Sequence, residues 1–459
     1  MRKRQVKGWV SFLDETAKMR WCVLIVAILL LSFPLYSAQE LYKEEKRYIN
    51  VAVYPSIVPA IKVLEYSLKY GWEVDGIYYQ FNVSEINMKE AEGRGRNPLN
   101  TANYDVLVIG ASARQYFHGI NTRWKENVRK FVASGGGYVG VCGGANEASL
   151  GYEHPKTFFD HVINAGVLGI ANVYINDDQN EEWQYLYKSA GLEGGVPVAC
   201  ELTKHPIVAV SPDNPRIIRY EGGPGMYEGD GNDDLFGEIT PIAFYAEEIS
   251  EKAPIHFWKK INGEWKIVGD VKTDLKGLYA AIATTYGNGR VVLFGPHPEE
   301  KTVIGGHVEE FLGRNKYTLY RQDYLYRWVN GTPMNWSYNW WILRRSVAWA
   351  AGVSEGHLPP VDESMLFITQ PNIWHPGIYL NGRKVLPASV NVFVGRAKIS
   401  VYCNFDGKVE FYIDGEKIFE DSSQPYEWGG NIEKGWHEVE VKARNGDITV
   451  YGNMMVYSV

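Results

Sequence analysis

The hydrophobic positions follow two different periods along the chain. Up to about residue 355, continuous apolar runs alternate with segments in which apolar residues recur every three to four positions. Continuous runs are typical of strands buried on both faces, and the longer period is typical of helices. We predict strands over Tyr48–Tyr54, Asp105–Gly110, Tyr138–Cys142 and Arg290–Phe294, and helices over Ile57–Tyr70, Thr122–Ser134 and Ile342–Gly352. This alternation predicts an α/β domain over residues 46–355 with a parallel sheet covered on both faces.

After a proline-containing linker at residues 356–363, the hydrophobic period changes to two. Val439, Val441 and Ala443 alternate with charged positions, and Asn-Gly or Asp-Gly pairs at four places indicate hairpin turns. Short strands with regular turns predict a β-sandwich over residues 364–459. The segment KVEFYIDGEKIFEDSSQPYEW resembles bacterial immunoglobulin-like domains, which implies an immunoglobulin-like β-sandwich that serves as a spacer or adhesion module.

The N-terminal region follows neither pattern. Residues 1–20 carry six basic and two acidic side chains, and residues 21–39 carry no charge. About 20 apolar residues span a bilayer as a helix, and a basic flank places the N-terminus in the cytoplasm. We expect a transmembrane helix at residues 21–39, behind a cytoplasmic tail, with residues 40–459 outside the cell. The alternative is a cleaved signal peptide, indicated by the small pair Ser37-Ala38, in which case the protein is secreted.

Composition excludes several classes of protein. The 459 residues have a net charge of −7, which disfavours non-specific binding to nucleic acid because phosphate affinity comes mainly from Lys and Arg. Four cysteines are too few for a disulfide scaffold in a chain of this length. We therefore expect a globular protein with a small-molecule or cell-envelope substrate, no nucleic-acid partner and no metal requirement. The oligomeric state is left open.

Cys142 stands where a predicted apolar strand meets the segment GGANEAS. Ligands of parallel sheets bind at the carboxyl ends of the strands, and the glycines before and after this cysteine leave room around the sulfur. Amides at the start of a following helix favour a thiolate and can stabilise an oxyanion. Cys142 is thus a candidate nucleophile. The alternative is a small buried side chain in a tight strand-to-helix turn.

A second segment, GRVVLFGPHPE, delivers His297 and Glu299 at the end of another predicted strand. A histidine beside a carboxylate supplies a general base and the group that orients it, which are the partners that a cysteine nucleophile needs. Taken singly, His297 is also compatible with a loop residue and Glu299 with a solvated charge.

Together the runs GGGYVGVCGGANEAS and GPHPE resemble the class I glutamine amidotransferase-like superfamily, and most closely its biotin-protein ligase N-terminal domain family. The segment IIRYEGGPGMYEG also fits that family. The resemblance implies a flavodoxin-like parallel sheet. It also implies that Cys142 is the nucleophile, His297 the base and Glu299 its orienter. The implied oxyanion and substrate-binding positions are Gly110, Ala111, Gly143, Gly144, Asn146, Tyr220, Gly222 and Gly223.

The sequence departs from that family in ways that affect function. Asn146 stands where glutamine-hydrolysing members usually carry glutamine, and neither a synthase nor a ligase catalytic domain accompanies the motifs. The leading hypothesis is therefore a membrane-tethered, extracytoplasmic cysteine hydrolase of amide or related acyl bonds. The alternative is a non-catalytic surface protein that binds glycans or other envelope components through the same pocket and the sandwich.

Two further segments carry weaker signals. The loop EGDGNDD places Asp230, Asn232 and Asp234 at alternate positions, which suits calcium, but the full calcium-loop pattern is missing and a solvated turn is the preferred interpretation. Residues 317–349 are dense in aromatic side chains. These either form an exposed platform for a ligand or pack the last helix onto the sheet.

Overall fold

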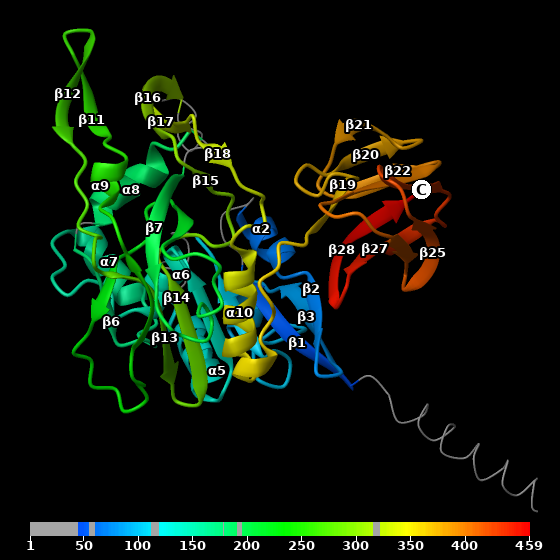
Figure 1. Ribbon diagram of the computed structural model, residues 1–459, viewed down its shortest axis with the longest axis horizontal. Coiled ribbons are helices and arrows are strands. Elements are labelled where there is room, and N and C mark those ends of the chain that lie inside the picture. Colours follow the sequence, from blue (N-terminus) through cyan, green and yellow to red (C-terminus); the bar gives the residue numbers. More distant parts are fainter. Residues whose placement is uncertain (1–44, 55–59, 112–118, 178, 191–194, 315–321) are drawn as a thin grey trace, which may run out of the picture. The chain divides into compact units, whose positions relative to one another are not determined.

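The computed structural model describes residues 45–54, 60–111, 119–177, 179–190, 195–314 and 322–459 (Figure 1). Up to residue 358 its strands are β1 (Glu45–Tyr54), β2 (Tyr70–Val74), β3 (Ile77–Glu85), β4 (Val106–Ile109), β5 (Gly137–Val141), β6 (Val173–Ile175), β7 (Val196–Leu202), β8 (Arg216–Tyr220), β9 (Met226–Glu228), β10 (Thr240–Tyr245), β11 (His256–Ile261), β12 (Glu264–Asp270), β13 (Tyr279–Tyr286), β14 (Gly289–Phe294), β15 (Val303–Ile304), β16 (His307–Arg314), β17 (Gln322–Val329) and β18 (Thr332–Pro333).

The helices of the same region are α2 (Ala60–Ser67), α3 (Met88–Ala91), α5 (Thr122–Ala133), α6 (Gly143–Ala148), α7 (Phe158–Gly166), α8 (Gln179–Tyr187), α9 (Ile249–Lys252), α10 (Trp340–Ala350) and a 3₁₀ turn (Glu355–His357). By its internal contacts the chain divides into two units. One comprises Met1–Lys46 with Gly76–Tyr78, where the described Lys46 ammonium lies 5.7 Å from the centre of the Tyr78 ring. The other comprises Arg47–Asp75 and Tyr79–Val459.

Four parallel strands form the centre of the main sheet. β4 pairs with both β1 and β5, and β5 pairs with β14, all in parallel register. In this register Ile109 lies opposite Gly140, and Val141 lies opposite Phe294, so β4, β5 and β14 end at the same edge. Residues of both faces of these strands are buried, which explains their continuous apolar sequence.

Helices cover both faces of this parallel centre. α5 buries Trp124, Val128, Phe131 and Val132 in the same core as Leu107, Tyr138 and Leu293. α10 packs on β4, β5 and β14, and is seen in yellow in Figure 1. The predicted helix 122–134 matches α5. The predicted helix 57–70 is too long, because α2 ends at Ser67 and Tyr70 begins β2.

The predicted fold class, an α/β domain with a flavodoxin-like parallel sheet, is wrong. Strands make up 44% of the structure and helices 16%. β13 runs antiparallel to β14, and it continues the sheet through the antiparallel pairs β10–β13, β7–β10 and β7–β8. These strands come from the long segment between Cys142 and His297. Of these pairs only β13–β14 is closed by a short turn, and the others join strands that are well separated in the sequence. The antiparallel pairs make the sheet mixed and the protein mostly β.

The aromatic-rich segment 317–349 divides among several roles. Trp340 and Trp341 are fully buried on α10. Tyr324 stacks on Trp258 with ring centres 3.7 Å apart, and Tyr326 donates to the Tyr185 carbonyl. Residues 315–321 lie outside the described part. The described aromatic residues thus mainly serve packing.

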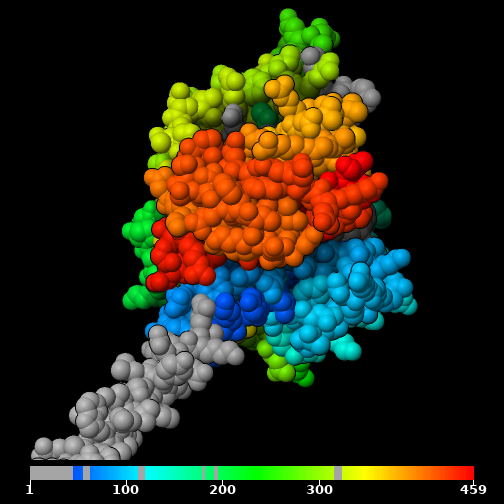
Figure 2. Space-filling model, turned by 90° about the vertical axis from the view of Figure 1, so that its right-hand side faces the viewer, coloured from blue at the N-terminus to red at the C-terminus, as the bar shows by residue number. Residues whose placement is uncertain are grey.

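Residues 366–459 form two sheets. Their strands are β19 (Leu366–Gln370), β20 (Gly377–Leu380), β21 (Arg383–Pro387), β22 (Asn391–Val394), β23 (Ala397–Cys403), β24 (Val409–Ile413), β25 (Glu416–Asp421), β26 (Tyr426–Gly430), β27 (Gly435–Asn445) and β28 (Ile448–Ser458). Figure 2 shows many of them as a broad orange-to-red surface.

The alternation along β27 and β23 is as predicted, and the three-stranded sheet β19–β23–β26 packs against the larger sheet near Gly452. β22, however, pairs in parallel with both β20 and β28. Immunoglobulin sandwiches are built from antiparallel sheets. The immunoglobulin-like description is therefore corrected to a two-sheet β region with parallel pairs.

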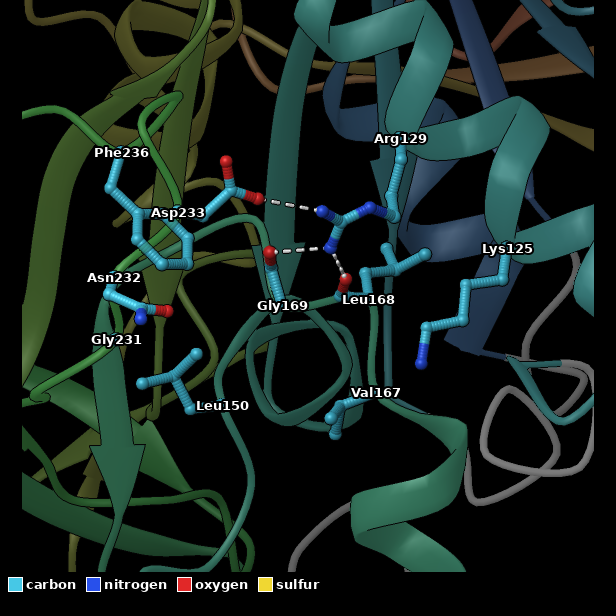
Figure 3. Close-up of a pocket in the computed structure, with 10 residues that line it drawn as sticks. All are labelled: Lys125, Arg129, Leu150, Val167, Leu168, Gly169, Gly231, Asn232, Asp233 and Phe236. Carbon is cyan, nitrogen blue, oxygen red and sulfur yellow. Dashed lines mark hydrogen bonds and ion pairs between the residues drawn. The ribbon is translucent and has the colours of Figure 1, made fainter.

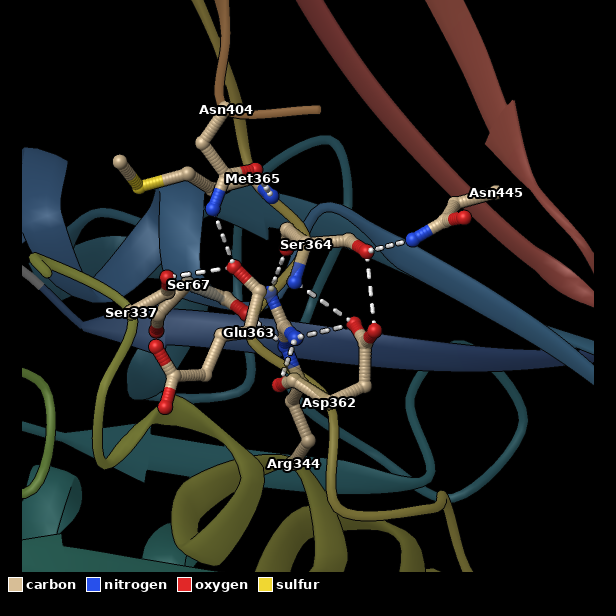
Figure 4. A network of polar contacts seen from close by, with 9 residues as sticks. All are labelled: Ser67, Ser337, Arg344, Asp362, Glu363, Ser364, Met365, Asn404 and Asn445. Carbon is tan, nitrogen blue, oxygen red and sulfur yellow. Dashed lines mark hydrogen bonds and ion pairs between the residues drawn. The ribbon is translucent and has the colours of Figure 1, made fainter. Parts of the chain in front are cut away.

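This β region joins the main sheet. Tyr70, Gly71 and Trp72 of β2 pair with β28 in antiparallel register. The predicted linker is held by Arg344 of α10, whose guanidinium donates to the carbonyls of Ser67, Asp362 and Ser364 at 2.9, 3.2 and 3.0 Å (Figure 4). Ser337 and Asn404 donate to the Glu363 carbonyl from opposite sides of the linker. Buried polar contacts thus fix this stretch of chain.

The predicted membrane segment, residues 21–39, lies outside the described residues. Within the described ranges no helix is long and apolar enough to cross a membrane, and α5, with 12 residues, is the longest. This finding contradicts the prediction of a single-pass membrane protein with residues 40–459 outside the cell.

Candidate active site

The common edge of β4, β5 and β14 brings the predicted site residues to one place. Gly110 and Ala111 follow β4, Cys142 follows β5, and His297 follows β14 by three residues. The Cys142 amide donates to the Phe294 carbonyl at 2.7 Å, which ties the cysteine turn to the strand that carries the histidine. The two motifs, 155 positions apart, therefore converge through strand pairing.

Cys142 occupies a strained turn. Its backbone has φ 52° and ψ −106°, a region that non-glycine residues rarely adopt and that costs about 1–3 kcal/mol. A side chain at Gly144 would come within 2.1 Å of the Ile109 carbonyl oxygen, and one at Gly140 within 2.4 Å of the Gly144 oxygen. The glycines thus let α6 approach β4 and β5 closely. The Cys142 side chain stays 8% exposed.

His297 and Glu299 form a buried pair. The Nδ1 atom of His297 and Oε1 of Glu299 are 2.9 Å apart, and both residues are almost fully buried. The His297 amide donates to the Arg219 carbonyl at 2.7 Å, which anchors the turn to β8. Nε2 of His297 has no hydrogen-bond partner among the described residues, so it is available to a thiol or a substrate.

The electrostatics of His297 favour the imidazolium. Burial opposes the charged form, but the negative charges of Glu299 and of Cys142 outweigh it and raise the pKa of His297 well above its usual value. A charged imidazole next to a sulfur stabilises the thiolate. The pair is therefore suited to activate Cys142 and later to release a proton.

The predicted oxyanion positions lie around this turn. Gly143 and Gly144 open α6, where helix amides have no acceptor within the helix. Asn146 is buried on the same helix, and Gly110 is buried at the end of β4. Ala111 is partly exposed at the boundary of the described residues.

A second wall comes from β8 and the loop that follows. Gly222 has φ +82°, and a side chain at Gly223 would meet the Gly295 carbonyl at 1.9 Å, so this loop packs directly on the turn that carries His297. The Tyr220 hydroxyl is fully buried and has no hydrogen-bond partner among the described residues. Burial, together with the nearby Glu182 and Cys142, raises the pKa of Tyr220 well above its usual value, so its hydroxyl keeps the proton and can donate it in a hydrogen bond.

Two charged residues near the histidine were not recognised from the sequence. Glu300 is buried, and burial raises its pKa to about 7, with Arg219 acting in the opposite direction. Arg219 is also buried and pairs with Glu221 at 2.5 Å. In the sequence, only its position directly after Glu299 could have indicated that Glu300 belongs to the site. Arg219 reaches the site through the pairing of β8 with the turn at His297, which no local pattern indicates.

Residues of the loop considered for calcium contact different parts of the structure. Asp230 accepts a hydrogen bond from the Tyr174 hydroxyl at 2.6 Å, whereas Asn232 lines a separate cavity with Asp233. Among the described residues no group of three or more His, Cys, Asp or Glu side chains is placed to hold a metal ion.

Comparison with known proteins gives only distant likenesses. No family model matches the chain, and no curated protein matches it. A β-galactosidase from Bacillus circulans sp. alkalophilus is 10% identical over 89% of this chain and 40% of its own, with a TM-score of 0.32. One from Rahnella sp. R3 is 9% identical over 88% and 41%, with a TM-score of 0.31.

Fibronectin(III)-like modules of Clostridium thermocellum CbhA are 22% identical over 20% of this chain and 95% of their own, with a TM-score of 0.16. The chain thus spans less than half the length of the two β-galactosidases. At these TM-scores the likenesses assign neither a fold nor a function.

Proposed function

We propose that this protein is a cysteine hydrolase of amide or related acyl bonds, with Cys142 as nucleophile, His297 as general base and acid, and Glu299 as its orienter. The observation that carries the proposal is the combination of a strained, slightly exposed Cys142 with a buried His297–Glu299 pair 2.9 Å apart at the same strand edge. Strained backbone at a non-glycine residue concentrates at functional sites. The likeness of the two motifs to those of cysteine amidotransferases supports the same roles.

In the proposed reaction the Cys142 thiolate attacks the carbonyl carbon, and the Gly143 amide stabilises the oxyanion. The carbon–nitrogen bond then breaks, and the His297 imidazolium gives its proton to the leaving amine. His297, now neutral, takes a proton from water, which attacks the thioester. The carbon–sulfur bond breaks, the acid leaves, and the Cys142 thiolate beside the His297 imidazolium is restored. Tyr220 is placed to donate a hydrogen bond to the substrate, since its buried hydroxyl has no other described partner.

Alkylation tests the proposal without knowledge of the substrate. The protein is treated with iodoacetamide at pH 6.5, where a free thiol, ionising near pH ~8.5, is mostly unreactive. We expect Cys142 to react at least about tenfold faster than free cysteine, and the excess to disappear in His297→Ala. Peptide mass spectrometry locates the label.

The chain supplies its own controls. Burial raises the pKa of Cys403 to about 11 and that of Cys200 further still, so both stay unlabelled in the folded protein. His307→Ala, at an exposed histidine, leaves the rate at Cys142 unchanged. Labelling of Cys142 no faster than that of free cysteine contradicts the hydrolase and leaves the non-catalytic binding protein as the alternative.

A further inference from the structure

A separate cavity of about 290 Å³ lies against α5, between the segment 167–169 and the loop 231–236 (Figure 3). Lys125 and Arg129 of α5 form one side, and Phe236 and Asp233 come from the opposite side. Leu150 and Val167 also line the cavity. None of these residues belongs to the proposed catalytic group.

Arg129 holds the cavity together through both of its terminal nitrogens. Its guanidinium donates to the carbonyls of Leu168 and Gly169, the latter at 2.8 Å. It also pairs with Asp233 at 2.8 Å and donates to the Tyr286 hydroxyl. Its charge is therefore neutralised by Asp233, and its donors fix the two loops that form the walls.

Lys125, one helical turn earlier, is not satisfied in this way. Its ammonium makes one long contact, 3.4 Å to the Ala165 carbonyl, and no carboxylate lies within ion-pair distance among the described residues. Burial and the neighbouring Arg129 lower the pKa of Lys125. Glu147 acts on Lys125 in the opposite direction, but burial raises the pKa of that carboxyl well above its usual value and so disfavours its charged form.

Besides the polar side chains of Asn232 and Asp233, the lining includes apolar ones. Leu150, Val167 and Phe236 present two aliphatic side chains and an aromatic ring. An inorganic anion would leave these walls unused, and a volume of about 290 Å³ lies at the lower limit of the usual 300–1,000 Å³ for small-molecule pockets. The geometry thus selects a compact ligand with one anionic group and an apolar body.

We propose that this cavity binds a small organic carboxylate, with its carboxylate on Lys125 and its aromatic or branched aliphatic body against Phe236, Leu150 and Val167. The site is independent of the reaction at Cys142. A bound carboxylate would supply the negative charge that Lys125 lacks, and charge-assisted hydrogen bonds of this kind are about twice as strong as neutral ones.

Benzoate and benzamide test the proposal, because they share shape and ring and differ in charge. Each is titrated into the full chain by isothermal calorimetry. We expect one saturable benzoate site per chain and at least about tenfold weaker binding of benzamide. Lys125→Met should weaken benzoate binding at least about tenfold, and Lys130→Met, at an exposed lysine of the same helix, should leave it unchanged.

Further titrations show whether benzoate binds in this cavity or elsewhere on the protein. Benzoate affinity that persists in Cys142→Ala and Tyr220→Phe supports a site away from the proposed active site, and its loss there overturns the assignment. Equal affinity for benzoate and inorganic phosphate overturns the role of the apolar walls. Absence of benzoate binding, or unchanged affinity in both Lys125→Met and Lys125→Gln, overturns the proposal as a whole.

Discussion

At the strand edge, a residue with a strained backbone lies among buried ionisable side chains. Cys142 keeps a positive φ, and His297, Glu299 and Glu300 are packed beside it with little exposure. Such groups cost stability and are kept where chemistry requires them. From the sequence, strand ends and the spacing of histidine and glutamate indicated Cys142, His297 and Glu299. The pairing with Arg219 and the burial of Glu300 depend on tertiary contacts and had no local signal.

Glu300 should make stability fall as pH rises. Its folded pKa of about 7 lies above the ordinary value of 4.5, so the folded protein binds a proton that the unfolded chain has released. As the pH rises from 4.5 to about 7, the unfolded chain loses this proton before the folded protein does. The free energy of unfolding therefore falls by up to about 3 kcal/mol over this range. In Glu300→Gln this loss should disappear. Urea denaturation at pH 5 and pH 8 measures the difference between wild type and variant.

Glu355→Gln provides the matched control, because this glutamate is exposed. Its pH dependence should follow that of the wild type. Equal pH dependence of Glu300→Gln and wild type would show that Glu300 is ionised in the folded protein at neutral pH.

At the scale of elements, long periodic segments were predictable and pairing was not. The predicted strands 105–110, 138–142 and 290–294 match β4, β5 and β14 to within one residue at each end. The predicted helix 57–70 includes Tyr70, the first residue of β2, and the rest of β2 is not predicted. The antiparallel strands β7, β8 and β10 lie in a segment without a clear period, and their place in the sheet is decided by pairing between segments well separated in the sequence.

The fit of α6 against β4 gives a prediction for this element. Gly144→Ala places a methyl group 2.1 Å from the Ile109 carbonyl oxygen, on backbone that cannot rotate away. We expect a loss of about 2–4 kcal/mol in the free energy of unfolding, since overpacking commonly costs 1–3 kcal/mol and this clash is with backbone. Urea denaturation of Gly144→Ala and of the control Gly356→Ala measures the change. Gly356→Ala, where nothing lies within 4 Å, should change stability by less than about 0.5 kcal/mol.

At the scale of the whole chain, the two-sheet β region and the main sheet share a buried connection. Sequence patterns predicted a stiff linker at 356–363, but they do not reveal that Arg344 holds it or that β28 pairs with β2. Arg344 lies on an apolar helix, where a buried arginine is unusual unless it is paired. Its acceptors are the carbonyl of Ser67 and, more than 270 positions later, the carbonyls of Asp362 and Ser364.

Arg344→Met should therefore destabilise the protein by about 3–5 kcal/mol, because three buried carbonyls and the Asp362 carboxylate lose their partner. Thermal unfolding by circular dichroism checks this. Arg444→Met, at an exposed arginine of β27, should leave the midpoint nearly unchanged. A small effect of Arg344→Met would mean that water replaces the guanidinium at the linker.

The pairing of β2 with β28 also determines when the protein can finish folding. Tyr70 pairs with Val450, 380 positions later, so the edge of β2 stays unpaired while the intervening chain is synthesised. Unpaired strand edges are templates for association with other chains, and contacts of such sequence separation form slowly. Nascent chains should therefore depend on chaperones until β28 has emerged from the ribosome and closed that edge.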